Sequence, residues 1–230
     1  GWLSLEDGAR VVALRSQLVR RLRGLGGMAV VERPHAELAA RLGPELAIAV
    51  VNTARSTVVA GEIPALESLL SMLQAEGVYA KRVEVDYASH CAQVDAVLPE
   101  LLEVLQPILP GEGRIRMISS VTGEEVKAPL DAAYWCRNLR ETVRLDRALA
   151  TLSALGADVF LEQSPHPVLG MALSEVGVYS GSLRREQGGM AELYRAWATL
   201  WVAGVELDRQ ALFGKGGPCP LPTMAFERQP

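Results

Sequence analysis

Residues 46–61 read LAIAVVNTARSTVVAG, and this stretch decides the fold of the first part of the chain. Two apolar runs rich in β-branched residues, 46–52 and 56–61, are joined by the mostly polar sequence Asn-Thr-Ala-Arg. Such runs are typical of strands, and a short polar connection between two of them is typical of a hairpin. The stretch therefore predicts two strands joined by a tight turn.

Outward from this hairpin, predicted helices and strands alternate. Before it lie a short strand at 28–31 and a helix at 34–42, which begins with a proline as first turns often do. After it lie an amphipathic helix at 63–76 and a strand at 80–86. The order β-α-β-β-α-β over about sixty residues is that of a ferredoxin-like subdomain, which we expect to be inserted into a larger one.

The rest of the chain also alternates between the two kinds of element. Helices are predicted at 4–23, 93–105, 132–140, 144–155, 168–176 and 190–203, and strands at 115–119, 158–162 and 179–183. This alternation predicts an α/β fold with a largely parallel sheet. The proline-rich stretch 218–223 is expected to be extended.

Composition excludes several functional classes. The chain has 230 residues and a net charge of −4, so it offers no basic stripe for a nucleic acid. No apolar run reaches the roughly 18 residues that cross a membrane, and no secretory signal is present. The three cysteines lack the spacing of disulfides or metal ligands, which favours the cytoplasm. The first residues, Gly-Trp-Leu, indicate a piece of a longer protein.

Residues 83–90 read Val-Glu-Val-Asp-Tyr-Ala-Ser-His and point to a catalytic base. An alternating run ends in a polar loop, and a strand-end loop is a common place for a general base. An alternative interpretation is that His90 is a buried structural residue with no catalytic role. If it is a base, Asp86 or a backbone carbonyl would fix its ring. Of the other histidines, His35 is expected at the surface and His166 in a turn.

A nucleophile for acyl transfer is not evident. No Gly-x-Ser-x-Gly elbow occurs in the sequence. Ser89 is adjacent to His90, and Ser164 precedes a proline. Either the protein forms no acyl-enzyme, or the nucleophile lies outside this chain.

Arg15 lies in the middle of the first predicted helix, on the stripe that contains Val11, Val12 and Leu18. A guanidinium beside an apolar face is costly to bury without an anion. One interpretation is an arginine that extends to solvent or pairs with an acid. The other is a bidentate clamp for a substrate carboxylate, which the guanidinium fits in shape and charge.

Several motifs in order are similar to those of the acyltransferase domain of modular type I polyketide synthases, a relative of malonyl-CoA:acyl-carrier-protein transacylases. The most specific is Val-Asp-Tyr-Ala-Ser-His at 85–90. The resemblance extends over essentially the whole chain. Further matches are 3–10 with 13–16, 52–61, Tyr134-Trp135 with 138–140, 164–169, 181–185, 221–223 and Ala225-Phe226.

The resemblance implies a domain plan. Residues 1–26 and 87–213 would form an incomplete α/β-hydrolase-like large subdomain, 27–86 the ferredoxin-like small subdomain, and 214–230 the linker after the acyltransferase. The Gly-His-Ser-x-Gly segment that carries the nucleophile in this family would lie just before residue 1. Thr142 and Gln163 depart from the residues that the family usually has at these positions.

The resemblance also implies roles for single residues. His90 would be the catalytic base and acid, and the backbone carbonyl of Asn138 would hold its ring. Arg15 would bind the free carboxylate of a malonyl-type group. Tyr87 and Ser89 occupy positions that correlate with the extender unit, and Tyr-Ala-Ser-His is similar to the methylmalonyl-selecting form. One methyl group in a pocket is worth only about 1–3 kcal/mol of discrimination.

The function so implied is transfer of an extender unit, methylmalonyl in preference to malonyl, from CoA to an acyl carrier protein through an acyl-serine. Acyl-CoA would be a substrate, phosphopantetheine would sit on the carrier, and no metal or nucleotide cofactor is expected. Ketosynthase and linker domains would be neighbours in the same polypeptide. Two alternatives stay open: an inert structural or interaction piece, and a stand-alone malonyl-CoA transacylase of fatty-acid synthesis. The Leu-Pro-Thr stretch at 221–223 argues against the second.

Overall fold

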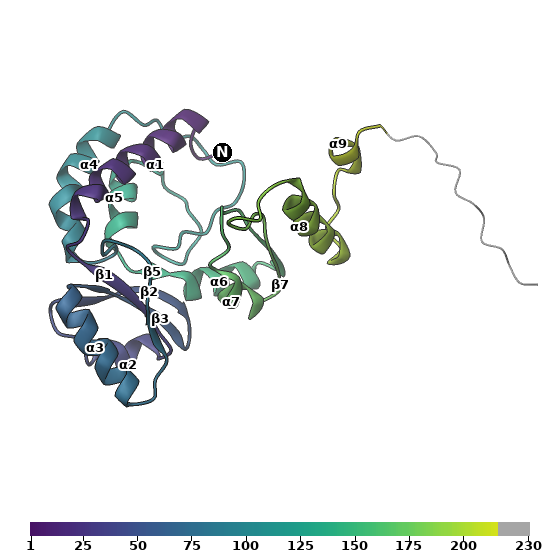
Figure 1. Cartoon of the computed structure of the whole chain (residues 1–230). Coiled ribbons are helices and arrows are strands. Elements are labelled where there is room, and N and C mark those ends of the chain that lie inside the picture. Colours follow the sequence, from purple (N-terminus) through teal and green to yellow (C-terminus); the bar gives the residue numbers. More distant parts are fainter. Residues whose placement is uncertain (216–230) are drawn as a thin grey trace, which may run out of the picture. The chain divides into compact units, whose positions relative to one another are not determined.

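The structure, a computed structural model, describes residues 1–215 (Figure 1). The chain divides into two compact units, Gly1–Asp158 with Met171–Gly177 and Val159–Gly170 with Val178–Pro230. The predicted extended stretch 218–223 and nearly all of the predicted linker 214–230 lie outside the described residues. Both units combine helices with strands, in agreement with the predicted α/β class.

A five-stranded sheet forms the centre of the first unit. Its strands are β1 (Gly27–Val31), β2 (Leu46–Thr53), β3 (Ser56–Gly61), β4 (Ala80–Arg82) and β5 (Val143–Arg144), in the order β4-β1-β3-β2-β5. The predicted hairpin is confirmed, since Thr53 pairs with Ser56 across the turn.

In this sheet only β2 and β5 run parallel, and the other neighbouring strands run antiparallel. A turn of two residues joins only antiparallel neighbours, so the hairpin places β3 beside β2, and β3 also pairs with β1.

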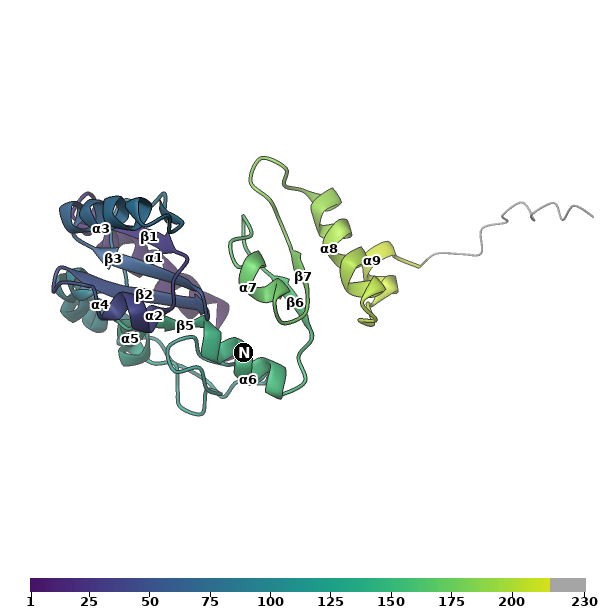
Figure 2. The same cartoon turned by 90° about the horizontal axis from the view of Figure 1, so that it is seen from below.

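Helices α2 (His35–Ala39) and α3 (Ile63–Ala75) cover one face of this sheet (Figures 1 and 2). Because side chains alternate along a strand, Ala29 and Val31 of β1 face these helices. They pack with Val59 and with fully buried leucines of the two helices, Leu38, Leu66 and Leu73. This apolar layer makes residues 27–82 the ferredoxin-like arrangement that the sequence predicts.

The opposite face of the sheet anchors the loop that follows β4. Met28, Val58 and Ala60 pack there against Ala88 and Cys91, all of them buried. The loop that contains residues 87–90 is therefore held against the sheet rather than free in solvent.

The predicted strand at 80–86 is shorter in the structure and ends at Arg82. Val83 still donates its N–H to the carbonyl of Met28 at 2.8 Å. The Val85 N–H then turns back to the carbonyl of Val83, also at 2.8 Å, which ends the ladder. The loop to His90 therefore begins four residues earlier than the sequence pattern indicates.

A helical layer completes the first unit. It contains α1 (Leu5–Val19), the 3₁₀ helices η1 (Arg20–Leu22) and η2 (Ala92–Val97), α4 (Leu98–Leu105) and α5 (Ala132–Arg140), with α6 (Leu145–Ala154) following β5. Ser4 caps α1, because its side chain accepts a hydrogen bond from the N–H of Asp7 at 3.0 Å. Their shared core includes Val11, Leu101 and Leu139.

Two predicted elements in this layer differ from the structure. The single helix expected at 93–105 is a 3₁₀ turn followed by α4, because Pro99 has no N–H to continue an α-helical ladder from residue 95. The strand expected at 115–119 is reduced to one bridge between Ile118 and Glu125. This segment closes its own turn at Gly123, whose φ is 78°, and pairs with no neighbouring strand in the described part of the chain.

The second unit contains β6 (Val159–Glu162), β7 (Val178–Gly181), α8 (Met190–Val202) and α9 (Arg209–Phe213), and α7 (Gly170–Ser174) lies between the two strands in sequence. β6 and β7 pair in parallel, so the predicted parallel arrangement is confirmed for this pair. Within residues 1–215, no helix is both long enough and apolar enough to cross a membrane.

Candidate functional site

His90 ends the loop that crosses the sheet. Ala88 and Ser89 are buried, and His90 itself is partly buried. Its φ of 57° places the backbone in the left-handed region, which costs a non-glycine residue about 1–3 kcal/mol. The N–H of His90 donates to the carbonyl of Leu139 at 3.1 Å, which holds this conformation against the end of α5. Strain that is fixed in this way is typical of functional sites.

The imidazole of His90 is oriented by a backbone carbonyl. Its Nδ1 lies 2.9 Å from the carbonyl oxygen of Glu141. A carbonyl can only accept, so Nδ1 carries the proton and Nε2 keeps a free lone pair. This is the tautomer that a general base requires.

The prediction that the Asn138 carbonyl holds this ring is wrong, because the carbonyl is that of Glu141. Helix α5 ends at Arg140, and Glu141 is extended, with φ −80° and ψ 155°. Its carbonyl therefore leaves the helix axis and meets the ring. The Asn138 carbonyl belongs to the last turn of α5, where carbonyls point along the axis.

Asp86, the other predicted partner of the His90 ring, forms an ion pair with Arg23 instead. Its carboxylate pairs with Nε of Arg23 at 2.6 Å, and both side chains are more than half exposed. The ring of His90 is thus fixed by the main chain and not by a carboxylate.

The surroundings of His90 favour its neutral form. Burial lowers the pKa of His90 because the imidazolium is poorly solvated there, and the positive charge of Arg15 acts in the same direction. The hydrogen bond to Glu141 opposes these effects only in part. A ring with a lowered pKa is neutral at pH 7 and available to accept a proton.

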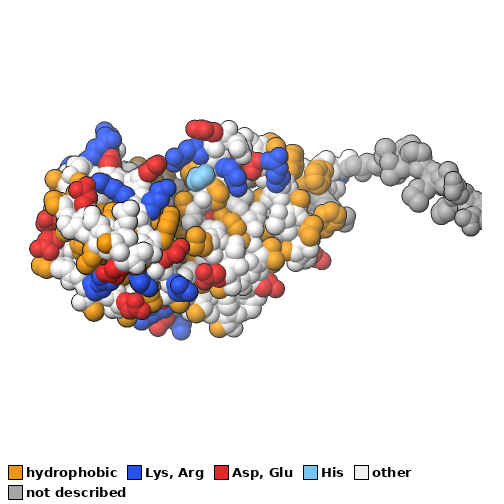
Figure 3. Space-filling view, turned by 60° about the horizontal axis from the view of Figure 1, so that its bottom comes forward, with side chains coloured by type: hydrophobic (Ala, Val, Ile, Leu, Met, Phe, Trp, Pro, Cys, Tyr) orange, Lys and Arg blue, Asp and Glu red, His pale blue; other side chains and the backbone are white. Residues whose placement is uncertain are grey.

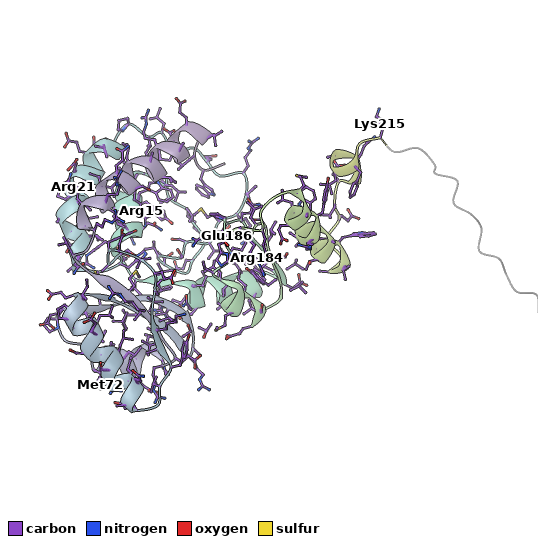
Figure 4. All side chains as sticks on the ribbon, viewed as in Figure 1. Arg15, Arg21, Met72, Arg184, Glu186 and Lys215 are labelled. Carbon is purple, nitrogen blue, oxygen red and sulfur yellow. The ribbon has the colours of Figure 1, made fainter. Side chains whose placement is uncertain are left out.

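Arg15 projects from α1 toward α5 (Figure 4). Its Nη1 donates to the side-chain oxygen of Asn138 at 2.7 Å. Burial lowers the pKa of Arg15, and the nearby Tyr87 acts in the opposite direction. Within residues 1–215, none of the ion pairs includes Arg15. The described part of the chain therefore does not support the interpretation in which Arg15 pairs with an acidic side chain.

The last turn of α5 brings the two predicted groups together. Asn138 contacts Arg15, and the carbonyls of Leu139 and Glu141 both contact His90. Arg15 is also close enough to His90 to lower the pKa of its imidazole. A partly buried cation and a neutral imidazole thus lie beside one another at one helix end.

Tyr87 and Ser89 lie in different surroundings. Tyr87 packs against the helical core and also lines an open hollow of 640 Å³ formed by residues 82–87. Ser89 is 8% exposed, and its hydroxyl lies 3.5 Å from the sulfur of Met28 in β1. Of these two predicted site residues, Tyr87 therefore lies near Arg15, and Ser89 lies against the sheet.

Glu141 is a candidate site residue that the sequence did not indicate. Its signal was nevertheless present, since an amphipathic helix capped by Asp131 ends just before the β-branched residues Thr142 and Val143. The first extended residue after such a helix turns its carbonyl outward. The group that contacts His90 is the main-chain carbonyl, and the residue type does not reveal such a contact.

Glu162, also missed, organises the turn that contains His166. Its buried carboxylate accepts hydrogen bonds from four groups. They are the Ser164 hydroxyl, the N–H groups of Val168 and Leu169, and the Tyr179 hydroxyl, at 2.8–3.1 Å. Burial acts to raise the pKa of Glu162, but these hydrogen bonds outweigh it and lower the pKa. The Ser164 hydroxyl also lies 2.9 Å from the carbonyl of the exposed His166, so its one proton is shared between the two acceptors. The rigid turn predicted at 164–167 is thus confirmed.

The described cysteines, Cys91 and Cys136, are free thiols, and burial raises the pKa of each. Cys219 lies outside the described residues. Among residues 1–215, no group of three or more His, Cys, Asp or Glu side chains is placed to bind a metal ion.

Trp197 and Trp201 are four residues apart and lie on one face of α8. With Tyr194 of α8 and Phe213 of α9, the two rings line an apolar hollow of 310 Å³. Trp201 is 62% exposed, so it is not a core residue. Figure 3 shows the orange apolar side chains that gather over this part of the second unit.

Residues 1–206 match the model of the acyl transferase domain family. The chain belongs to this family. Polyketide synthase GfsE of Streptomyces halstedii is 44% identical over 100% of the chain, which spans 6% of that synthase. Erythronolide synthase EryA2 of Saccharopolyspora erythraea is 40% identical over 100% of the chain and 7% of the synthase.

The solved structures agree with this assignment. The acyltransferase domain from module 8 of the salinomycin polyketide synthase is 42% identical, with a TM-score of 0.87 over 90% of this chain and 52% of that chain. The chain thus spans less than a tenth of the two synthases and about half of that solved chain. The predicted family and the α/β fold class are both confirmed.

Proposed function

We propose that this chain supplies the general base and the carboxylate clamp of an acyltransferase domain in a polyketide synthase. The domain would move a carboxylated acyl unit from CoA to an acyl carrier protein. One observation carries the proposal: the neutral imidazole of His90 and the guanidinium of Arg15 are both hydrogen-bonded to residues 138–141.

In the first half-reaction, Nε2 of His90 accepts the proton of a serine hydroxyl as the serine oxygen attacks the thioester carbonyl. The C–S bond breaks, and the CoA sulfur leaves with the proton from His90, which gives an acyl-serine. We infer that this serine lies outside these residues, since the sequence has no Gly-x-Ser-x-Gly elbow.

The second half-reaction reverses these steps. The phosphopantetheine thiol of the carrier protein gives its proton to Nε2 and attacks the acyl-serine carbonyl. The serine oxygen leaves with that proton, and the acyl group ends on the carrier. His90 is first base and then acid in each half, and the Glu141 carbonyl stabilises the imidazolium that forms in between.

Arg15 selects the acyl group. Its partial burial strengthens an ion pair with the free carboxylate of a malonyl-type unit. A simple acyl group such as propionyl offers no such partner and leaves the cation unpaired. The clamp therefore favours carboxylated extender units over monocarboxylic starters.

For the extender unit itself, we propose methylmalonyl in preference to malonyl. The proposal rests on the Tyr-Ala-Ser-His form of residues 87–90 and on the position of Tyr87 near Arg15. Discrimination of one methyl group is modest, at about 1–3 kcal/mol. Besides the carrier protein, ketosynthase and linker domains of the same polypeptide would be neighbours, and the chemistry needs no metal or nucleotide cofactor.

The chain is 40–44% identical to parts of two multidomain synthases, which favours this function over a stand-alone transacylase. The inert-fragment alternative is decided by labelling. If residues 1–230 by themselves acquire a covalent label from methylmalonyl-CoA, then the nucleophile is inside the chain, and the scheme above needs a different serine.

The direct test is loading of the intact protein with labelled methylmalonyl-CoA, followed by transfer to its carrier protein. His90→Ala is expected to slow both steps by about 10²–10⁴-fold. The matched control is His35→Ala, because α2 packs on the opposite face of the sheet from the loop of His90. Native rates in His90→Ala would remove this histidine from the mechanism.

A further inference from the structure

We propose that the side chain of Asn138 is a positioning residue, which aims the guanidinium of Arg15 at the carboxylate of the acyl group. The inference rests on the proposed clamp function of Arg15. It replaces the role that the sequence indicates for Asn138, because the main-chain contact to His90 is made by Glu141.

The contact joins two helices that are far apart in sequence. Arg15 lies in the third turn of α1, and Asn138 lies in the last turn of α5. Nη1 of Arg15 donates to Oδ1 of Asn138 at 2.7 Å, and both side chains are partly buried. A long arginine side chain loses rotamer freedom when it binds a ligand. A fixed partner removes much of that loss before the substrate arrives.

Asn138 binds Arg15 at Nη1, and the Nε–Nη2 edge of the guanidinium is the one that suits a carboxylate. Three other arginines of this chain, Arg116, Arg137 and Arg144, bind their carboxylates through Nε and Nη2. Arg15 is held at Nη1, and within residues 1–215 no hydrogen bond uses its Nε or Nη2. The same two-donor edge is therefore available for a carboxylate of the substrate.

The chemistry of the partner matters as well. An amide oxygen accepts a hydrogen bond but carries no net charge, so Arg15 keeps its full positive charge for the substrate. An aspartate at position 138 would have nearly the same shape and would neutralise the guanidinium. Asparagine thus orients the cation without competing for it.

Position 138 also links the clamp to the base. The next residue, Leu139, accepts from the backbone of His90, and Glu141 accepts from its ring. One helix end therefore sets the separation between the group that binds the carboxylate and the group that moves the proton. Displacement of the guanidinium would misplace the thioester relative to His90.

The test compares methylmalonyl-CoA with propionyl-CoA, which is the same acyl group without the carboxylate, in the intact protein. Asn138→Ala is expected to lower the ratio of the two kcat/KM values about tenfold, mainly through KM of the carboxylated substrate. Asn138→Asp, which keeps the shape, is expected to lower the ratio further. The control Asn52→Ala removes another asparagine hydrogen bond, that to Ser56, and is expected to leave the ratio unchanged.

The decisive measurement adds Asn138→Ala to Arg15→Ala. If Asn138 acts through Arg15, the double variant has the same ratio as Arg15→Ala. Two independent losses that multiply would overturn the positioning role, and so would an unchanged ratio in Asn138→Asp. Failure of the proposed clamp would look different. In that case Arg15→Ala would lower kcat/KM equally for methylmalonyl-CoA and propionyl-CoA. If Asn138→Ala does not fold, the isosteric Asn138→Asp decides the question.

Discussion

The ring of His90 and the carbonyl of Glu141 lie 2.9 Å apart, and in the proposed mechanism this contact would take the place of the carboxylate of a serine-protease triad. A carbonyl fixes the tautomer and stabilises a transient positive charge, but it adds no permanent negative charge. The pKa of His90 therefore stays low, because burial and Arg15 lower it and no acid opposes them. As the proposed base, such a ring would be weaker than one paired with aspartate and would stay neutral to lower pH.

The first prediction concerns the pH dependence of acyl loading. The pKa of His90 is lowered from 6.5 by burial, so the acid limb of the rate profile should have its midpoint below pH 6.5. Because the unfolded state binds the proton more readily, the stabilising contribution of neutral His90 is full above pH 6.5 and is lost as pH falls toward the folded pKa. Single-turnover loading between pH 5 and pH 8 measures the midpoint, and a value above 6.5 would contradict the assignment.

The second prediction concerns Thr142, which follows the residue that holds the ring. Its hydroxyl donates to the carbonyl of Ile48 in β2 at 2.7 Å and fixes the chain just after Glu141. Thr142→Val keeps the shape and leaves that carbonyl without its donor, so the free energy of unfolding should fall by about 1–2 kcal/mol. Urea denaturation checks the stability.

Loading kinetics give a second readout for the same variant. If residue 142 fixes the Glu141 carbonyl, kcat should fall severalfold while KM for the acyl-CoA stays close to its native value. A loss of stability with native kcat would separate residue 142 from the site. Thr53→Val in the β2–β3 hairpin is the matched control, since its hydroxyl accepts only from the exposed N–H of Arg55.

The sequence was sufficient for the parts of the fold that depend on local pattern. The hairpin at 46–61 and the helices α1, α3 and α5 follow from apolar periodicity, turn residues and caps. The failures at 80–86 and 115–119 have one cause: a β-branched run becomes a strand only where a neighbour accepts its hydrogen bonds. The N–H of Val85 instead bonds the carbonyl of Val83, and Ile118 forms a single β-bridge, to Glu125.

The site shows the same division. The residue types of His90 and Arg15 made them visible in sequence, because a partly apolar context makes a histidine or an arginine unusual. The contacts that orient them were not visible, since they run through the main chain of Glu141 and the amide of Asn138, 51 and 123 residues away along the chain. Only the packing of α5 against α1 and the loop sets these distances.

The third prediction concerns Glu162 in the second unit. Its ionised carboxylate accepts four hydrogen bonds, and Glu162→Gln replaces one of its acceptor oxygens by a donor facing N–H groups. The melting temperature should fall, by an amount equivalent to about 1–3 kcal/mol. Glu84→Gln, an exposed matched control, should melt like the native protein.

The pH dependence of this stability follows from the sign of the pKa change. Hydrogen bonds lower the pKa of Glu162 despite its burial, so its contribution is present above the ordinary value of 4.5 and is lost as pH falls below it. Thermal melts at pH 7 and pH 4 should therefore differ more for the native protein than for Glu162→Gln. Equal differences would show that this carboxylate does not link stability to pH.

The last prediction separates the roles of Tyr87 and Ser89 in the Tyr-Ala-Ser-His motif. Ser89 is buried with its hydroxyl against Met28, so Ser89→Phe must displace β1 and should lower the free energy of unfolding by about 1–3 kcal/mol or more. Tyr87 packs against the helical core but also lines an open hollow, so Tyr87→His should lower the free energy of unfolding less than Ser89→Phe does. In competition between methylmalonyl-CoA and malonyl-CoA, Tyr87→His should shift the product ratio toward malonyl by about tenfold, within the range for one methyl group. A shift produced by Ser89→Phe at native stability would instead show that residue 89 reaches the acyl group, and that its contact with Met28 yields at little cost.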